Sequence, residues 1–217
     1  MNIRKVGWIR KMVYVWRNFR SQHSYINGKN NKINIRGQRV GSRIQICGYG
    51  NTVIVEDNAL LLNSIIRISG NNNLVRLKSD SYVSGAELWV EDNGCEIEIG
   101  ERTFIGHHTH LACTEDGSKL IVGSDGMISS YVQIRTGDSH SILNIEGERI
   151  NKAQSIRIGD HCWIGEGSKI LKGVELDGDN IVATGAIVSK SFGKNTLIAG
   201  VPGKIVKENV TWGKERI

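Results

Sequence analysis

Residues 156–193 read IRIGDHCWIGEGSKILKGVELDGDNIVATGAIVSKSFG. Large aliphatic residues recur at every sixth position of this stretch, at Ile158, Ile164, Ile170, Leu176, Val182 and Val188. A period of six fits neither the 3.6-residue repeat of a helix nor the simple alternation of one strand. It does fit a parallel β-helix, in which short strands joined by tight turns stack their aliphatic side chains inward. The stretch therefore predicts an all-β solenoid.

A looser form of the same repeat precedes this stretch, from residue 27 onward. Asn- and Gly-rich turns alternate with pairs of aliphatic residues, and the equivalent aliphatics are Ile35, Val55, Leu77, Ile99 and Val122. Their spacings are 20, 22, 22 and 23 residues, and the spacing from Ile158 to Leu176 is 18, or three hexads per coil. We therefore predict a triangular prism of about eight coils over residues 27–193, with neighbouring strands roughly 4.8 Å apart.

The period breaks once, between Val122 and Ile158, where the step is 36 residues and 18 of them are surplus to one coil. We expect this surplus to leave the prism as a loop over residues 137–155, GDSHSILNIEGERINKAQS. Loops held on a rigid scaffold often carry chemistry. His140 lies in this loop, and a neutral imidazole oriented by Asp138 or by a backbone carbonyl could accept a proton near pH 7. We favour a catalytic role over that of an ordinary surface histidine.

The two ends of the chain depart from the repeat. Residues 1–20 have the spacing of a basic amphipathic helix. We expect residues 1–26 to cap the solenoid or to pack on a neighbouring subunit, because solenoids need capped ends. Peripheral contact with a membrane surface, or with a polyanion, is the alternative. Residues 194–217 are rich in Lys and are expected to form a C-terminal tail.

Composition limits the compartment and the partners. The net charge of +6 suits an anionic partner, although ordinary solubility would explain it equally well. The four cysteines show no CxxC spacing, and Cys113 and Cys162 take inward or near-inward positions of hexads. We therefore expect buried free thiols and a reducing compartment. With no secretory signal and no apolar run of membrane-spanning length, the sequence predicts a cytoplasmic protein, with the inner face of the membrane as the alternative.

Other side chains are candidates for binding. Trp163 takes an outward hexad position, and an exposed Trp indicates a ligand or a partner surface. The HHTH run over residues 107–110 lacks the acidic or Cys residues that would complete a metal shell, so we expect no metal. Five lysines on or after the regular coils could bind phosphates or form a solvated face: Lys169, Lys172, Lys190, Lys204 and Lys207. Basic residues are not interleaved with stacking aromatics, so a nucleic-acid surface is not expected.

The hexads, together with RTGDSHS at 135–141 and GERINKAQSIRIGDHCWIG at 147–165, resemble the hexapeptide-repeat acyltransferases of the left-handed β-helix family. Within that family they look most like the capsular polysaccharide and polysialic acid O-acetyltransferases. The resemblance covers about residues 95–207. It implies a left-handed coil, which spacing alone does not show. It also implies a homotrimer that holds acetyl-CoA in grooves between its subunits.

The resemblance also implies roles for individual residues. His140 matches the catalytic base, Trp163 matches a Trp that flanks the thioester, and Asp138 and Ser139 match positions beside the acetyl group. Small residues that let the pantetheine run close to the coils are matched by Gly165, Ala183, Thr184, Gly185 and Ala186. Cations near the CoA phosphates are matched by Lys190 and Lys204, and Lys169 completes the expected cofactor-binding set. Asn180 is a departure, because it takes an inward position that is usually aliphatic.

The resulting hypothesis is direct acetyl transfer from acetyl-CoA to a sugar hydroxyl of a bacterial surface polysaccharide, with His140 as general base. A capsule that contains sialic acid would suit the positive net charge. No Ser or Cys is obviously paired with a base, so a covalent acetyl-enzyme is not expected. One alternative is the same chemistry on a small acceptor such as an antibiotic, serine or a nucleotide-linked sugar. Another is a non-catalytic β-helix that serves as an assembly module.

Overall fold

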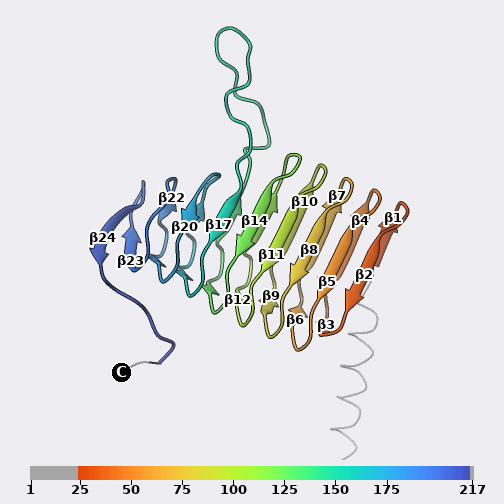
Figure 1. Ribbon diagram of the computed structural model, residues 1–217, viewed down its shortest axis with the longest axis horizontal. Coiled ribbons are helices and arrows are strands. Elements are labelled where there is room, and N and C mark those ends of the chain that lie inside the picture. The colour runs from red at the N-terminus through yellow and green to blue at the C-terminus, as the bar shows by residue number, and fades with distance from the viewer. Residues whose placement is uncertain (1–23, 216–217) are drawn as a thin grey trace, which may run out of the picture.

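The computed structural model describes residues 24–215, which form a left-handed parallel β-helix with three faces (Figure 1). The chain visits sheets A, B and C in turn, and each coil adds one strand to each sheet. The helix expected over residues 1–20 lies outside the described residues. Within residues 24–215, no helix has the length and hydropathy needed to cross a bilayer.

The three sheets are built from short strands that pair in parallel, with one exception at the C-terminal end. Sheet A contains β1(Ser24–Asn27), β4(Arg43–Cys47), β7(Ile65–Ser69), β10(Glu87–Glu91), β13(His110–Cys113), β16(Gln133–Arg135), β19(Lys169–Ile170) and β22(Ile187–Val188). Sheet B contains β2(Lys32–Ile35), β5(Thr52–Val55), β8(Leu74–Leu77), β11(Glu96–Ile99), β14(Lys119–Val122), β17(Ile156–Ile158) and β20(Glu175–Leu176). Sheet C contains β3(Gln38–Val40), β6(Leu60–Leu62), β9(Tyr82–Ser84), β12(Phe104–Ile105), β15(Met127–Ile128), β18(Trp163–Ile164), β21(Ile181–Val182), β23(Thr196–Ala199) and β24(Lys204–Glu208).

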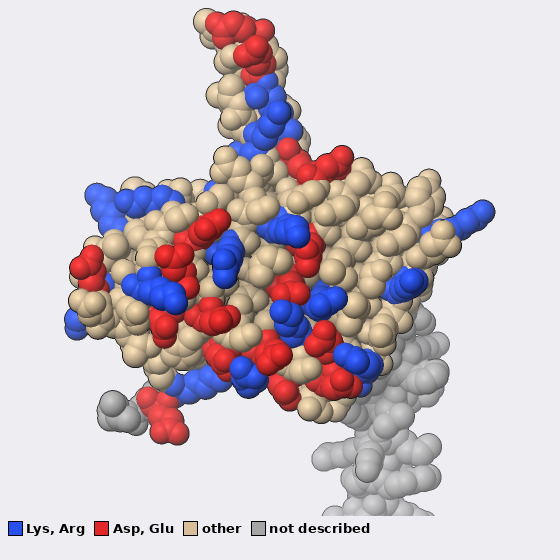
Figure 2. Space-filling model, in the orientation of Figure 1, with Lys and Arg blue, Asp and Glu red and all other residues tan. Residues whose placement is uncertain are grey.

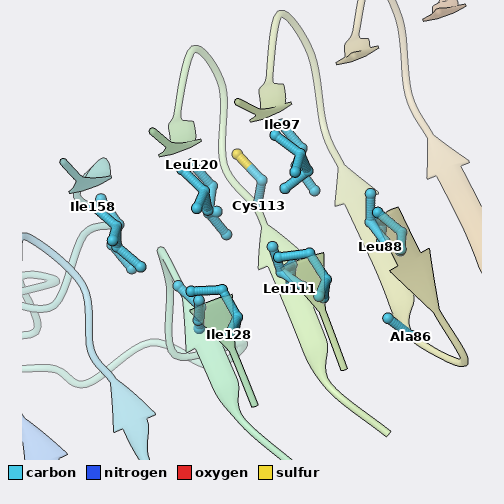
Figure 3. Close-up of a cluster of buried hydrophobic side chains, with 14 of the residues drawn as sticks. Ala86, Leu88, Ile97, Leu111, Cys113, Leu120, Ile128 and Ile158 are labelled. Carbon is cyan, nitrogen blue, oxygen red and sulfur yellow. The ribbon is translucent and has the colours of Figure 1, made fainter. Parts of the chain in front are cut away.

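The aliphatic register predicted from the sequence is the register of sheet B. Residue by residue, the paired ladder runs through Ile35, Val55, Leu77, Ile99, Val122, Ile158 and Leu176. Val122 pairs directly with Ile158 despite the 36-residue step, so the prism continues undisturbed past the loop. Figure 3 shows the core that results, with aliphatic side chains from successive coils, such as Leu111 and Ile128, stacked in rows. The six-residue period is thus a direct image of stacking in space.

Polar groups inside the prism are satisfied by hydrogen bonds between coils. Asn180, the inward residue that departs from the usual pattern, is fully buried. Its side-chain amide donates to Gly193 O at 2.6 Å and to Thr196 Oγ1 at 2.8 Å. Near the other end, the buried Asn51 accepts a hydrogen bond from the Asn73 backbone N–H at 3.0 Å. Because a buried unpaired amide would be costly, these ladders explain how asparagine occupies core positions.

The cysteines match the expected burial. Cys113 and Cys162 are fully buried, and no cysteine among the described residues forms a disulfide. Burial raises the pKa of the Cys162 thiol to about 12. A thiol with a raised pKa is a poor nucleophile, so Cys162 packs in the core and takes no part in chemistry.

The C-terminal region, expected to be a tail, contains two strands. β23 pairs in parallel with β21, and β24 folds back antiparallel on β23. The chain then returns across sheet C, where the Trp212 ring stacks on His161 with centroids 4.7 Å apart. The Trp212 indole N–H donates to His161 O at 2.8 Å. The last coil is therefore covered by the chain that follows it.

Candidate active site

The surplus residues leave the prism at the corner between sheets A and B, after β16, and return at β17. Figure 1 shows them as a long arm that rises from the edge of the prism. The arm is a hairpin, in which Leu143 and Arg149 form an antiparallel bridge and the Ile150 N–H donates to Ile142 O at 2.9 Å. Its exposed aliphatic side chains are Ile142, Leu143, Ile145 and Ile150. Clustered apolar exposure of this kind marks a contact surface.

Asn151 fixes the base of the arm, and it is only 6% exposed. Its Oδ1 accepts hydrogen bonds from the Ile142 N–H at 2.7 Å and from Arg149 Nε at 3.2 Å. Its Nδ2 donates to His140 O at 2.8 Å and to Asp138 Oδ2 at 2.9 Å. One side chain therefore ties both strands of the hairpin to the segment that carries His140.

Two ion pairs anchor the arm to the prism. Arg149 binds Glu115 through both guanidinium nitrogens, with Nη1 3.1 Å from Oε2. Lys172 binds the Asp138 carboxylate and also donates to Asn151 O at 2.9 Å. The hydrogen bond from Lys172 is the main reason that the pKa of Asp138 lies below its ordinary value. Asp138 is therefore ionised at neutral pH and serves as an anchor.

His140 is exposed next to these anchors. Its backbone N–H donates to Asp138 O at 2.8 Å, which closes a tight turn at Ser139, where φ is 65°. The Ser139 hydroxyl accepts a hydrogen bond from Arg135 Nη2 at 2.6 Å. The carboxylate of Asp138, suggested above as a partner for the imidazole, engages Lys172 and Asn151 through Oδ2. A pocket of about 190 Å³ beside the ring is lined by Glu91, Asp92, Thr114, Glu115, Ser139, His140, Ser141 and Arg149.

Trp163 points outward from β18, as its hexad position predicts, and is 39% exposed. It lies on sheet C between Met127 and Ile181, and its ring centroid is 6.1 Å from that of Trp212. The arm leaves at the opposite corner, between sheets A and B, and Figure 1 shows it rising away from the strands of sheet C. Within one chain, His140 and Trp163 therefore lie on opposite sides of the prism.

The predicted small residues meet at the corner between sheets C and A. Ala183, Thr184 and Gly185 form the turn between β21 and β22, and Gly185 has open space where a Cβ would point. Gly165 is buried, and a Cβ there would lie 2.6 Å from Thr184 N, so coil stacking requires glycine at this position. Ala186 is 1% exposed and packs in the core, because it holds an inward position of its hexad. The surface open to a ligand is therefore Thr184 and Gly185.

Two of the three predicted phosphate-binding lysines come together. Lys190 and Lys204 line one pocket of about 430 Å³ at the C-terminal end of the prism, with Ser191, Phe192, Gly193 and Ile205. Lys190 Nζ lies 5.5 Å from the centroid of the Phe192 ring. Lys169 is exposed on β19 of sheet A and does not line this pocket. A pocket that holds two cations fits the phosphates of a CoA thioester.

The HHTH run forms a corner, as expected. Thr109 points inward and is fully buried, while His107 and His108 are exposed on the turn. The His108 ring stacks on Tyr131, with centroids 4.9 Å apart and an interplanar angle of 20°. In residues 24–215, no group of three or more His, Cys, Asp or Glu side chains is placed to hold a metal ion.

The sequence gave no warning of the residues that hold the loop. Asn151 and Arg149 lie inside the surplus segment, and their place there was the one signal that could have drawn attention to them. Glu115 and Lys172 lie in turns of the flanking coils, 34 residues from their partners Arg149 and Asp138. No local pattern connects such pairs before the coils are stacked.

A left-handed prism of hexads with one extruded, histidine-bearing loop defines the class of hexapeptide-repeat acyltransferases. The chain is 34% identical over 192 residues to the polysialic acid O-acetyltransferase of Neisseria meningitidis, covering 87% of this chain and 88% of that protein. The crystal structure of the polysialic acid O-acetyltransferase OatWY matches with a TM-score of 0.85 at 32% identity, over 90% of this chain and 93% of that one. The polySia-specific acetyltransferase NeuO matches with a TM-score of 0.81 at 30% identity, over 90% of both chains.

No model from a collection of protein families matches the sequence. The relatives nonetheless cover nearly the whole chain at above 30% identity. The chain therefore belongs to the polysialic acid O-acetyltransferase family, and it is an O-acetyltransferase.

Proposed function

We propose that this protein transfers the acetyl group of acetyl-CoA to a hydroxyl of an anionic bacterial surface polysaccharide, with polysialic acid as the acceptor. The observation that carries the proposal is the match to polysialic acid O-acetyltransferases over about nine-tenths of both chains. The net charge of +6 favours a polyanionic acceptor. Three buried cysteines without disulfides and the need for acetyl-CoA support a cytoplasmic location.

We propose that the working unit is a homotrimer with active sites between subunits. His140 and Trp163 lie on opposite sides of one prism, so they can face the same substrate only if two copies meet. The exposed aliphatic side chains of the arm support a contact between the arm and a neighbouring subunit. In this arrangement the arm of one subunit brings His140 to sheet C of the next.

The chemistry of the faces supports sheet C as the contact surface. Figure 2 shows basic and acidic side chains intermixed over the face that carries sheet B, where Lys119 pairs with Glu96 at 3.2 Å. Sheet C instead presents an outward ladder of apolar residues in register: Leu60, Tyr82, Phe104, Met127, Trp163, Ile181 and Leu197. A face laced with ion pairs is suited to water, whereas an apolar ladder is suited to a partner.

His140 acts as the general base in this mechanism. Its imidazole takes the proton of the acceptor hydroxyl as the new carbon–oxygen bond forms, and later returns a proton to the departing CoA thiolate as the carbon–sulfur bond breaks. General-base assistance contributes about 10²–10⁴-fold, and holding both substrates in one groove contributes up to ~7–11 kcal/mol. The indole N–H of Trp163, or a backbone N–H, stabilises the tetrahedral oxyanion. The pocket of Lys190 and Lys204 holds the CoA phosphates.

The proposal predicts acceptor-dependent release of CoA that weakens with salt. With acetyl-CoA and polysialic acid oligomers, we expect the KM for the oligomer to rise several-fold between about 50 and 300 mM salt, because screening weakens contacts with a polyanion. The measurement is thiol release followed with a colorimetric reagent, with neutral dextran as the control acceptor. Equal rates with dextran and polysialic acid, or faster transfer to serine, an antibiotic or a nucleotide-linked sugar, would show that the acceptor is wrong.

Lysine variants test the position of the phosphates. We expect Lys190→Ala and Lys204→Ala each to raise the KM for acetyl-CoA about fivefold, because an exposed ionic contact is worth about 1 kcal/mol. Lys32→Ala is the matched control, since it removes an exposed lysine from β2 near the far end of the prism. Initial rates at varied acetyl-CoA concentration give these values. Unchanged KM values in both pocket variants would place the phosphates elsewhere.

A further inference from the structure

A column of residues in the left-handed backbone conformation runs along the corner between sheets C and A. Each coil contributes one residue to it, and the column contains Asn63, Gly85, His108, Tyr131, Gly167 and Gly185. Backbone hydrogen bonds link consecutive turns, for example from the Tyr131 N–H to His107 O at 2.9 Å and from the Gly167 N–H to Ser130 O at 3.1 Å. The column is therefore a continuous surface feature on which Tyr131 and His108 are the only members with rings.

Tyr131 is an unfavourable choice for its place in this column. Its φ is 59°, a region that glycine and asparagine tolerate and that is an outlier for bulky residues. Other long side chains in this conformation gain an ion pair, such as Arg102 with Asp125 and Glu115 with Arg149. The Tyr131 hydroxyl has no hydrogen bond within the described residues, and the residue is 56% exposed. Folding alone does not account for this ring, and residues strained in this way cluster at functional sites.

The ring lies next to the candidate active site. Met127, at the start of the same short segment, pairs with Trp163 on the following coil. Tyr131 and Gly167 follow these two residues by the same number of positions, so Tyr131 lies about 4.8 Å from the Trp163 coil, toward the N-terminal end. Thr184 and Gly185, the open residues proposed for CoA, lie on the other side of that coil. One corner therefore has an open glycine track on its C-terminal side and an aromatic step on its N-terminal side.

A polar pocket adjoins the aromatic step. Its volume is about 300 Å³, and it is lined by Asn63, Ile65, Gly85, Ala86, Glu87, His108, Thr109 and His110. The Glu87 carboxylate is 2.8 Å from Arg67 Nε, so it is held in place as an acceptor. Burial lowers the pKa of His110, whose neutral ring offers one donor and one acceptor. A carboxylate in the wall disfavours an anionic group, so the pocket suits hydroxyl groups of a sugar.

We propose that Tyr131 and His108 form the platform on which the acceptor polysaccharide docks. One pyranose ring stacks on the exposed face of Tyr131, and hydroxyl groups of the next sugar enter the pocket beside His108. The polymer then extends toward the N-terminal coils, while CoA extends toward the C-terminal coils from the same point near Trp163. This inference rests on the proposed function and assigns the acceptor side of that site.

Tyr131→Asn tests this inference because asparagine tolerates the backbone conformation. We expect Tm to be unchanged or higher, while the KM for polysialic acid oligomers rises roughly five- to tenfold, the scale of one aromatic contact. The KM for acetyl-CoA should stay within about twofold of the parent value, because the CoA side of the corner is untouched. Tyr131→Phe keeps the stacking ring and should keep the acceptor KM within about twofold.

Tyr49→Asn is the matched control, since Tyr49 is 60% exposed in the turn between β4 and β5 at another corner. A Tyr131→Asn variant with the parent KM for polysialic acid would overturn this inference and leave the proposed function standing. A rise of the acceptor KM in Tyr49→Asn as large as that in Tyr131→Asn would also overturn it. If the parent protein failed to release CoA with polysialic acid oligomers, the proposed function and this inference would fall together.

Discussion

Replacing His140 with alanine is expected to lower kcat for acetyl transfer to polysialic acid about 10²- to 10⁴-fold. The loss follows from the proton that the acceptor hydroxyl must give up as its oxygen attacks the thioester. The contacts that hold this turn use backbone atoms of His140, its N–H to Asp138 O and its carbonyl to Asn151 Nδ2. These contacts survive the substitution, so Tm and the affinity for acetyl-CoA should match those of the parent protein.

The measurement is the initial rate of CoA release at saturating acetyl-CoA and polysialic acid oligomer. Lys152→Ala serves as the control, because it removes an exposed side chain from the same loop. If His140→Ala retains a rate within about threefold of the parent value, far from the loss expected of a general base, then another group removes the proton.

Replacing Asn151 with alanine is expected to lower kcat about 10- to 100-fold, although Asn151 need not touch the substrate. Its side chain makes hydrogen bonds with Ile142, Arg149, His140 and Asp138, so its loss frees the segment that carries His140. A displacement of about 1 Å in a catalytic group can cost about 10²-fold. The KM for acetyl-CoA should remain near the parent value, because the proposed CoA surface lies at a different corner. A split between kcat and KM is what separates a positioning role from general loss of the fold.

Asn151→Asp sharpens this test. It keeps the acceptor oxygen for the Ile142 N–H and for Arg149, but it loses the donor and sets a carboxylate against Asp138. We expect its kcat to fall at least as far as that of Asn151→Ala. Asn144→Ala is the control, since Asn144 bonds only within the hairpin, to the backbone and carboxylate of Glu148. Parent-like kcat in both Asn151 variants would show that His140 is positioned by other contacts.

Much of the fold could be predicted from the sequence because, in a solenoid, sequence period and spatial pairing are the same quantity. Ile158 and Leu176 are 18 residues apart and pair directly, which is what three hexads per coil require. The same logic fails after Val188. Val182 pairs with Ile198 across 16 residues, which is not a multiple of six, so β23 does not continue the count. β24 then reverses direction, and its docking depends on tertiary contacts that no period encodes.

The site could be predicted only in part, for a related reason. The interrupted period located His140, and the hexad register showed that Trp163 points outward. The anchors of the loop, such as the pair formed by Glu115 and Arg149, join a turn of the prism to the loop across 34 residues. Side chains at such separations become neighbours only when coils stack. Tyr131 was also missed, because its backbone conformation is not visible in a residue pattern.

The pairing of Val122 with Ile158 has a consequence for how this scaffold can change. The step that spans the arm is 36 residues, twice the 18 of the coil from Ile158 to Leu176. The entropy of closing a flexible loop grows only with the logarithm of its length, so this doubling costs about 0.6 kcal/mol. The prism can therefore carry a longer, shorter or altered arm at little cost in folding free energy. Acceptor preference can diverge in the arm while the ladder beneath it keeps its register.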